Sequence, residues 1–293
     1  MIKGTTQELI NKVRKIEIKT RGLSEQLFSG EYHSAFKGRG MAFSEVREYS
    51  PGDDIRTIDW NVTARSGDAH VKVFEEEREL TVFIIVDISA SGNFGSTGQE
   101  KAELMAELAA TIAFSAIKNS DKVGLILFSD QIELYVPPSK GKKHILRMVR
   151  DMLKHEQKSK GTNINVALEF LARIAKKRAI CFLMSDFISP DYSSNLGLVA
   201  KKHDLVAMNI GDKLDREIPN IGLSAIKDPE TGKSTLIDTS SKSVRQKYLE
   251  LSDEVREETS RLLRKKKVDE VILNTGEDFA IPLHTFFKRR LSR

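Results

Sequence analysis

Residues 81–92 read TVFIIVDISASG, and they carry the strongest structural signal of the chain. Val82–Val86 is an uninterrupted apolar run, which is typical of a strand buried on both faces of a parallel sheet. The run ends in Asp87, and hydroxyl side chains follow at Ser89 and Ser91. The stretch therefore predicts a central strand that brings oxygen-bearing side chains to one edge of a sheet.

The residues that follow alternate between helix and strand patterns. Helices are predicted at 100–118, 142–153, 165–177, 192–202, 241–266 and 278–291, and strands at 122–128, 132–137, 179–186, 204–210 and 268–274. Such alternation predicts an α/β fold, a mostly parallel, Rossmann-like sheet with helices on both faces. The strands 122–128 and 132–137 are joined by the short turn Ser129–Gln131, so we expect an antiparallel pair at or near one edge. The last strand and helices are expected to complete the same sheet.

Two units are predicted along the chain. Residues 1–80 are expected to form a mixed N-terminal arm, with a helix over 5–18 and short strands around the run REYSPGDDIRTIDW (47–60). Residues 81–293 are expected to form the α/β domain, with a hairpin insertion at about 220–240.

Composition excludes several classes of protein. The chain has 293 residues, 30% of them charged, and no apolar run long enough for a membrane span or a secretory signal, so we expect a soluble, cytoplasmic protein. Its one cysteine, Cys181, excludes an internal disulfide framework and a thiolate zinc site. The net charge is +5, and most of that excess lies in residues 241–293, where 13 Lys and Arg face 9 Asp and Glu.

Oxygen ligands gather where the predicted strands end. Asp87, Ser89 and Ser91 follow the first strand, Thr162 lies in the loop before the helix at 165–177, and Asp186 ends the strand 179–186. Hard oxygen ligands without His or Cys favour Mg²⁺, with Mn²⁺ or Ca²⁺ as alternatives. Five such groups leave room on the ion for water or for a carboxylate of another molecule.

This pattern resembles the von Willebrand factor A domain, whose metal-ion-dependent adhesion site is written Asp-x-Ser-x-Ser, then Thr, then Asp. The resemblance implies direct metal ligation by Ser89, Ser91 and Thr162, with Asp87 and Asp186 bound directly or through water. Phe187 departs from the pattern, because adhesion-type domains usually have a small Gly there. We expect this Phe to narrow access to the ion.

A narrower resemblance covers most of residues 38–293. GRGMAFSEVREYSPGDDIRTIDWNVTARSG (38–67), followed by VKVFEEERELTVFIIVDISASG (71–92), is similar to the bacterial family catalogued as domain of unknown function 58. That resemblance implies a non-enzymatic adaptor or chaperone-like partner of a MoxR-type AAA+ ATPase, or of its client protein, acting through the metal site. Many members carry membrane helices near the N-terminus and this sequence shows none, although membrane-anchored partners remain open.

The run at 47–60 and its surroundings also have a physical interpretation. Asp53, Asp54 and Asp59 can accept hydrogen bonds from backbone N–H groups and from the nearby arginines Arg47, Arg56 and Arg65. Trp60, the only tryptophan, is expected to anchor the arm against the domain. Two interpretations stay open, a network that fixes the arm and a direct contact surface for a partner.

Three other functions can be compared with the sequence: nucleotide binding, metal-dependent hydrolysis and nucleic-acid binding. TGKST (231–235) lacks the first glycine of a phosphate loop, because Lys227 stands there, so nucleotide binding is not expected. A metal-dependent hydrolase is an alternative without an obvious general base. A nucleic-acid binder would use the basic C-terminus, Arg264–Lys267 above all, with Phe286 and Phe287; core packing of these two aromatics is the expected alternative, and no nucleic acid is expected as a partner.

Overall fold

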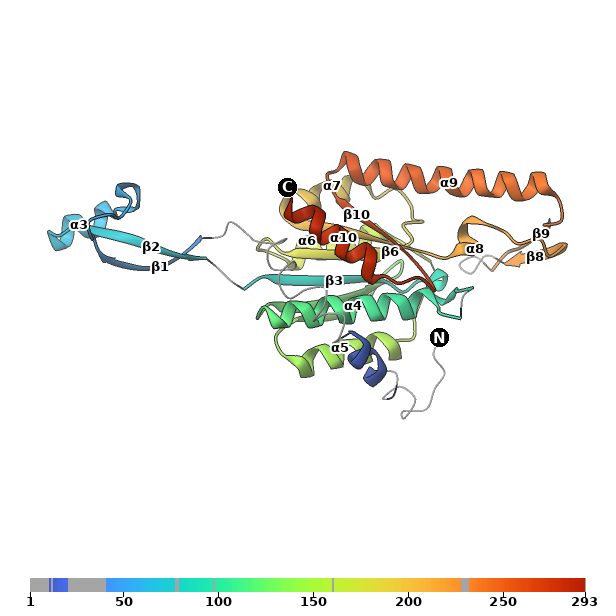
Figure 1. Ribbon diagram of the computed structural model, residues 1–293, viewed down its shortest axis with the longest axis horizontal. Helices are drawn as coiled ribbons and strands as arrows, with labels where there is room; N and C mark the ends of the chain where they lie inside the picture. The colour runs from blue at the N-terminus through green and yellow to red at the C-terminus, as the bar shows by residue number, and fades with distance from the viewer. Residues whose placement is uncertain are drawn as a thin grey trace.

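A six-stranded sheet forms the centre of the molecule, in the order β10-β7-β6-β3-β4-β5 (Figure 1). The computed structural model describes residues 11, 13–20, 41–76, 79–96, 98–159, 161–227 and 232–292. The strands are β3 (Thr81–Asp87), β4 (Lys122–Phe128), β5 (Ile132–Ser139), β6 (Ile180–Ser185), β7 (Asp204–Gly211) and β10 (Asp269–Asn274). All neighbours pair in parallel except β4 and β5, which confirms the predicted edge pair and places the last strand in the same sheet.

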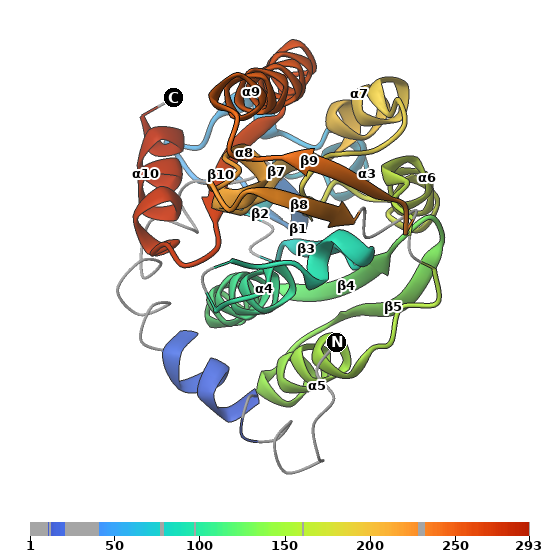
Figure 2. The ribbon, with the colours of Figure 1, turned by 90° about the vertical axis from the view of Figure 1, so that its right-hand side faces the viewer.

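Helices cover both faces of this sheet, as Figure 2 shows. The helices α4 (Lys101–Lys118), α5 (Lys142–Lys154) and α10 (Ala280–Leu291) contribute to one hydrophobic cluster. The helices α6 (Ile164–Ile174) and α7 (Ser193–Lys202), with the end of α9 (Lys242–Lys265), contribute to the other. The predicted fold class, a mainly parallel α/β sheet between helical layers, is therefore confirmed.

The pattern of β3 explains why two layers form. Val82, Ile84 and Val86 belong to the first cluster, while Phe83 and Ile85 belong to the second. Successive side chains of a strand point to opposite faces, so a continuous apolar run needs cover on both sides. Burying each such side chain contributes about 1.5–3 kcal/mol, and this fixes the strand at the centre of the sheet.

The first described helix, at 13–20, packs against the same layer as α4 and α5. Ile16 is buried in the first cluster, and Lys19 pairs with Glu107 at 2.6 Å. Glu17 pairs with Lys142 at 2.5 Å. The predicted start of this helix, near Thr5, lies outside the described residues.

Two hairpins extend beyond the sheet. The arm consists of β1 (Met41–Glu48) and β2 (His70–Glu76), an antiparallel pair that carries η1 (Ile55–Thr57) and α3 (Trp60–Ser66) at its far end (Figure 1). The second hairpin pairs β8 (Leu223–Lys227) with β9 (Ser234–Asp238). Most of its predicted tip, 228–233, lies outside the described residues.

The C-terminal helix resolves one open question about aromatic residues. Phe286 and Phe287 are buried in the first cluster, at 3% and 0% exposure, so the expected core packing is confirmed. Their rings are not available for stacking on bases. Within the described residues, no helix combines the length and the hydropathy that crossing a bilayer requires.

A buried histidine gives the fold a defined acid sensitivity. His203, which follows α7, is 2% exposed, and neither ring nitrogen has a hydrogen-bond partner among the described residues. Burial, together with the charges of Lys202 and Arg178, lowers the pKa of His203 to about 4. Its stabilising effect is complete above the unfolded pKa and is lost as the pH falls from about 6.5 to about 4. The contribution of His203 to the unfolding free energy should fall by about 2 kcal/mol between pH 7.5 and pH 5.

Urea unfolding at these two pH values tests this expectation. The change in unfolding free energy from pH 7.5 to pH 5 should be about 2 kcal/mol more favourable in His203→Phe than in the wild type, because the substitution removes a group that only the unfolded chain protonates in this range. An unchanged pH dependence in the variant would assign the acid sensitivity to other groups.

Candidate metal centre at the carboxyl edge of the sheet

Asp87 lies buried at the end of β3, with 3% exposure. Its carboxylate accepts hydrogen bonds from the Ser185 hydroxyl at 2.6 Å and from the Ser89 backbone N–H at 2.9 Å. Burial and the nearby charge of Asp186 raise the pKa of Asp87 to about 7, against the opposing effect of those hydrogen bonds. No lysine or arginine of the described residues pairs with this carboxylate, so its negative charge is uncompensated.

The two hydroxyls that follow Asp87 lie together. Ser89 Oγ and Ser91 Oγ are 3.1 Å apart, Ser89 is buried, and Ser91 lies in the 3₁₀ turn η2 (Ala90–Asn93). Neighbouring ligands of an octahedral Mg²⁺ stand about 3.0 Å apart when each metal–oxygen distance is about 2.1 Å. The hydroxyl pair beside an uncompensated carboxylate therefore fits a divalent cation.

The Thr162 loop reaches the same edge through the end of β4. Thr162 is buried at 7% exposure, and the backbone N–H of Asn163 donates to the Ser129 carbonyl at 3.0 Å. The preceding residues are held by Glu133, which accepts from the backbone N–H groups of Lys158 (3.1 Å) and Ser159 (3.2 Å). Glu133 also accepts from the Ser129 hydroxyl at 2.8 Å, so one buried carboxylate fixes both segments that flank the loop.

Glu133→Gln is expected to loosen this loop. Burial opposes ionisation of Glu133, but its donors outweigh burial and lower its pKa, so the charged form is the one that holds the backbone. The donors from Ser129, Lys158 and Ser159 all reach Oε1, and an amide removes the negative charge that strengthens these three bonds. We therefore expect a cost of about 2 kcal/mol and faster hydrogen exchange at residues 156–163. Glu169→Gln, an exposed carboxylate on α6, is the matched control. Unchanged protection at 156–163 would show that other contacts hold the loop.

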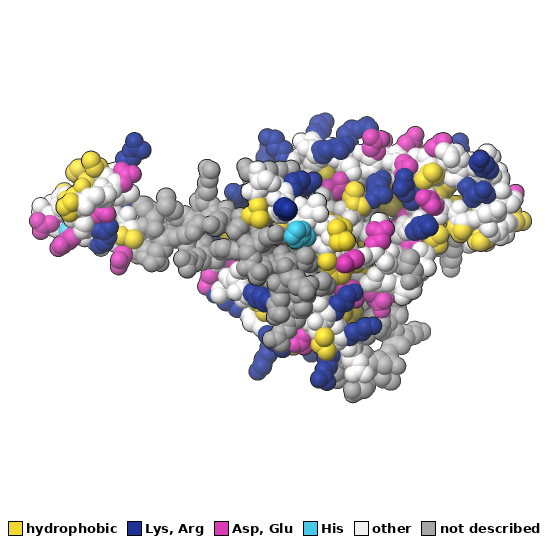
Figure 3. Space-filling model, viewed as in Figure 1, with side chains coloured by type: hydrophobic (Ala, Val, Ile, Leu, Met, Phe, Trp, Pro, Cys, Tyr) yellow, Lys and Arg dark blue, Asp and Glu magenta, His cyan; other side chains and the backbone are white. Residues whose placement is uncertain are grey.

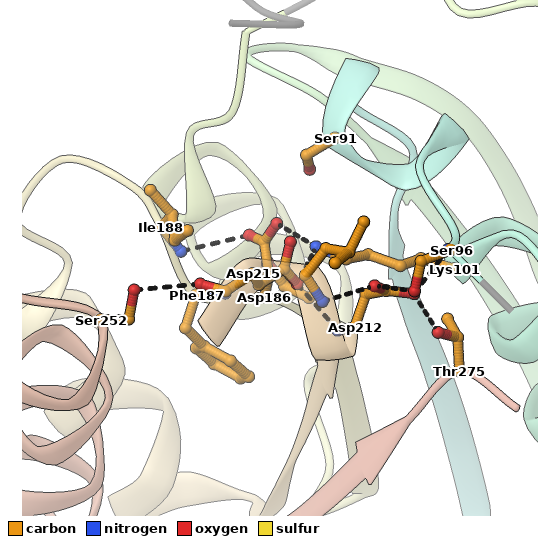
Figure 4. A network of polar contacts seen from close by, with 12 residues as sticks. Ser91, Ser96, Lys101, Asp186, Phe187, Ile188, Asp212, Asp215, Ser252 and Thr275 are labelled. Atoms are coloured by element: carbon orange, nitrogen blue, oxygen red, sulfur yellow. Dashed lines mark hydrogen bonds and ion pairs between the residues drawn. The ribbon is translucent and has the colours of Figure 1, made fainter. Parts of the chain in front are cut away.

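Asp186 follows β6 and has both of its oxygens occupied. Oδ2 accepts from Lys101 Nζ at 3.3 Å, and Oδ1 accepts from the Ile188 backbone N–H at 3.2 Å. Phe187 adopts φ +60°, the left-handed region that favours glycine, and its ring is buried near Tyr192, with centroids 6.2 Å apart. The expectation that Phe187 narrows access to the ion is wrong, because its side chain packs into the core below the edge (Figure 4).

Lys101, Asp212 and Asp215 are site residues that the sequence interpretation missed. Lys101, at the start of α4, is 3% exposed and lies 2.8 Å from Asp215 and 3.3 Å from Asp186 (Figure 4). Asp212 directly follows β7, so the strand-end argument that found Asp87 and Asp186 could have found it. Lys101 gave no such signal, because a lysine in an amphipathic helix ordinarily faces water.

Asp212 joins three segments of the edge. It accepts from the Ser96 N–H (2.9 Å) and hydroxyl (2.6 Å), from the Leu214 N–H (2.8 Å) and from the Thr275 hydroxyl. Burial opposes its ionisation, but the hydrogen bonds from Ser96 and Thr275 outweigh burial and lower the pKa of Asp212 to about 2. Asp212 is thus ionised and fully engaged, and it holds the loop after β3 to the loops after β7 and β10.

The predicted ligands therefore differ in how they are satisfied. Within the described residues, no three His, Cys, Asp or Glu side chains come together as a metal cluster, so a site here depends on hydroxyl ligands. The observations place Asp87, Ser89 and Ser91 as a fitting donor set beside Asp186. For Thr162, the structure gives burial at the same edge.

The arm contains part of the predicted Arg–Asp network. Arg47 and Asp53 form a two-bond salt bridge at 2.7 and 2.6 Å, and this pairing lowers the pKa of Asp53. Asp54 caps η1 through the Arg56 N–H, and Asp59 caps α3. Among the described residues, neither the Arg56 nor the Arg65 guanidinium pairs with these aspartates.

The expected anchoring role of Trp60 is wrong. Trp60 begins α3 at the far end of the arm and is 68% exposed, and Ile55 beside it is 67% exposed. The hairpin carries both away from the domain, so the indole has nothing there to pack against (Figure 1). Their exposure leaves the second interpretation of this run, a contact surface, open.

Comparison with known proteins gives the family. The sequence model of the family described as "Protein of unknown function DUF58" matches residues 45–258. The chain belongs to this family. An uncharacterized protein of Mycobacterium tuberculosis strain H37Rv, Rv1480, is 30% identical over 237 residues, which are 79% of the DUF58 chain and 75% of that relative.

Solved structures with a similar fold include two with related descriptions. BatB of Bacteroides thetaiotaomicron has a TM-score of 0.47 at 15% identity, covering 73% of the DUF58 chain and all of that chain. The SpRpn10 VWA domain has a TM-score of 0.38 at 9% identity, and the match covers 70% of the DUF58 chain and 93% of that domain. Both scores are below 0.5, so the fold class stands on the strand order of the DUF58 chain itself.

Proposed function

We propose that the DUF58 chain is a non-enzymatic protein-interaction module that holds a divalent cation, Mg²⁺ by preference, at the carboxyl edge of its sheet. Asp87, Ser89, Ser91 and Thr162 would hold the ion, with Asp186 beside it. A bound ion supplies a positive charge with open coordination positions, which suits the capture of an acidic side chain from a partner.

The observation that carries this proposal is the uncompensated carboxylate of Asp87 next to two buried or half-buried hydroxyls. A buried charge without a cationic partner costs free energy, and proteins normally pair such groups or bind a metal with them. At Asp87 the described residues provide hydrogen-bond donors but no cation. A divalent ion would remove this cost, because it compensates the charge that burial penalises.

The surroundings of the edge support contact with another protein. A cavity of about 330 Å³ has a mixed lining, with charged residues that include Asp186 and Arg256 and with the aliphatic side chains of Ile188, Leu251, Val255 and Ile272. Ile188, Leu251 and Val255 are 61%, 52% and 49% exposed. Figure 3 shows further apolar side chains at the end of the molecule that carries the β8–β9 hairpin. A partner segment with an acidic residue and neighbouring apolar residues would match both features.

The partner class follows from the resemblance noted in the sequence. We propose a MoxR-type AAA+ ATPase, or its client protein, as the molecule that contributes the acidic side chain. The DUF58 chain would then act as an adaptor or chaperone-like partner, and any ATP hydrolysis would belong to the ATPase.

Binding of a purified MoxR-type ATPase, measured with and without chelator, tests this function. We expect Asp87→Ala and chelation each to weaken binding about 100-fold or more, because both remove the charge that the acid would contact. Glu277→Ala, an exposed carboxylate in the loop after β10, is the matched control and should bind as the wild type does. Binding that survives both treatments would overturn the metal bridge and make the arm, with Ile55 and Trp60, the contact surface to test.

A further inference from the structure

Lys101 lies at the same edge of the sheet, but the proposed set of metal ligands assigns it no role. It begins α4, directly after the loop that carries Ser89 and Ser91. Its side chain crosses the edge of the sheet to the loop after β6 and to the short helix α8 (Lys213–Arg216), which follows β7 (Figure 4). Its ammonium group lies 3.3 Å from Asp186 Oδ2 and 2.8 Å from Asp215 Oδ2. Only 4% of the side chain is exposed, so this charge is committed to the site.

The two aspartates that contact Lys101 are otherwise satisfied. Asp186 also accepts from the Ile188 N–H, and Asp215 also accepts from the Asp212 N–H at 2.8 Å. The two carboxylates therefore share one cation and each has a backbone donor, whereas the described residues give Asp87 donors but no cation. A second cation gains most where the negative charge is uncompensated, which is at Asp87.

We infer that Lys101, which Asp186 shares with Asp215, holds the Asp186 carboxylate in an ion pair and keeps it from ligating the ion, so that Asp87 is the single carboxylate ligand of a divalent cation here. This inference rests on the proposed function and assigns the roles within its site. It makes Lys101 a positioning residue that sets the charge of the site.

The charge balance has a direct consequence for what the site captures. A divalent cation balanced by Asp87 alone keeps one net positive charge, and serine and threonine hydroxyls do not reduce it. Two carboxylate ligands would cancel the charge and weaken the attraction for a third carboxylate. Lys101 therefore lowers the affinity of the site for the metal and raises the affinity of the bound metal for an acidic side chain of a partner.

Titration with Mn²⁺ alone, followed by electron paramagnetic resonance, tests the inference without a partner. Lys101→Met should bind Mn²⁺ about tenfold more tightly, because it removes a repelling charge and releases Asp186. Lys101→Met/Asp186→Asn removes a positive and a negative charge together and should bind within about threefold of the wild type. Asp87→Asn should lose about 100-fold or more. Lys213→Met, which removes an exposed lysine from the same edge, should change affinity less than about twofold.

The outcomes separate this inference from the proposed function. If the double variant loses binding as severely as Asp87→Asn does, Asp186 is a ligand and the inference is overturned while the metal site stands. If Lys101→Met binds Mn²⁺ with the affinity of the wild type, Lys101 does not act on the ion. The inference is then also overturned, while the metal site stands. If neither the wild type nor Lys101→Met binds Mn²⁺, both the inference and the metal-dependent function fall. Circular dichroism and thermal unfolding in chelator verify that each variant is folded.

Discussion

Asp87→Asn should stabilise the ion-free protein and abolish its stabilisation by Mg²⁺, two effects of opposite sign from one substitution. The side chain keeps its size, and an amide can still bond to Ser185 and to the Ser89 N–H. What the substitution removes is a buried negative charge without a cation. In chelator at pH 8 we expect a gain of about 2–4 kcal/mol in unfolding free energy.

The pH dependence gives the same charge a second signature. The pKa of Asp87 is raised from its ordinary value to about 7 in the folded chain. In chelator, the ionisation of Asp87 therefore lowers the stability of the wild type as the pH rises from about 4 to about 7, and the variant lacks this contribution. With saturating Mg²⁺ the wild type is stabilised at pH 8, because the ion binds the carboxylate form.

Chemical unfolding at pH 5 and pH 8, with chelator and with Mg²⁺, measures all four conditions. The contrast between them is more informative than either single condition, since a general packing defect would destabilise the variant everywhere. A variant that is less stable than the wild type in chelator at pH 8 would contradict the assignment of Asp87 as an uncompensated charge.

Asp212→Ala should be the most destabilising single change at this edge. Its carboxylate accepts from the Ser96 N–H and hydroxyl, the Leu214 N–H and the Thr275 hydroxyl. Removing it leaves the buried Thr275 hydroxyl and the half-buried Leu214 N–H without this acceptor and releases the exposed Ser96 to water. Unsatisfied buried donors cost about 1–3 kcal/mol each, and partial relaxation leaves an expected loss of about 3–5 kcal/mol. Asp238→Ala is the control, because Asp238 bonds to Ser240 in an exposed turn and should cost less than about 1 kcal/mol.

The unfolding free energy at low pH tests the same role of Asp212. Because the pKa of Asp212 is lowered to about 2, its contribution is complete above the ordinary value and is lost as the pH falls from about 4 toward 2. That contribution is about 2 kcal/mol, and Asp212→Ala should lack it. Equal acid dependence of the variant and the wild type would refute the role of Asp212 as the charged acceptor.

The sequence could predict those residues of the site that lie at or just after the end of a strand. Asp87, Ser89 and Asp186 follow buried strands, and the rule that ligands gather at the carboxyl edge brought them together before any coordinates. Asp212 obeys the same rule. Lys101 could not be found in this way, because its role depends on a side chain that crosses from α4 to loops about 85 and 114 residues later in the chain.

In the arm, the sequence could indicate contacts between neighbouring residues but not the position of the arm relative to the domain. Arg47 and Asp53 are six residues apart, and their salt bridge is one of several Arg–Asp contacts that the sequence allowed without choosing among them. The expected anchor, Trp60, failed because a large aromatic signals burial only if a surface is within reach, and local sequence does not say where a hairpin points. Short-range chemistry was readable, while its placement against the domain was not.

The sequence by itself determined the α/β class, the antiparallel edge pair and the gathering of Asp87, Ser89, Ser91 and Asp186 at one edge, because the apolar periodicity and the succession of helices and strands along the chain are local properties. Only the tertiary structure decided which charges at that edge are paired. It gave Asp186 and Asp215 the ammonium of Lys101 and left Asp87 without a cation. The physical reason is that burial and charge pairing depend on distances between distant segments, and packing alone sets those distances.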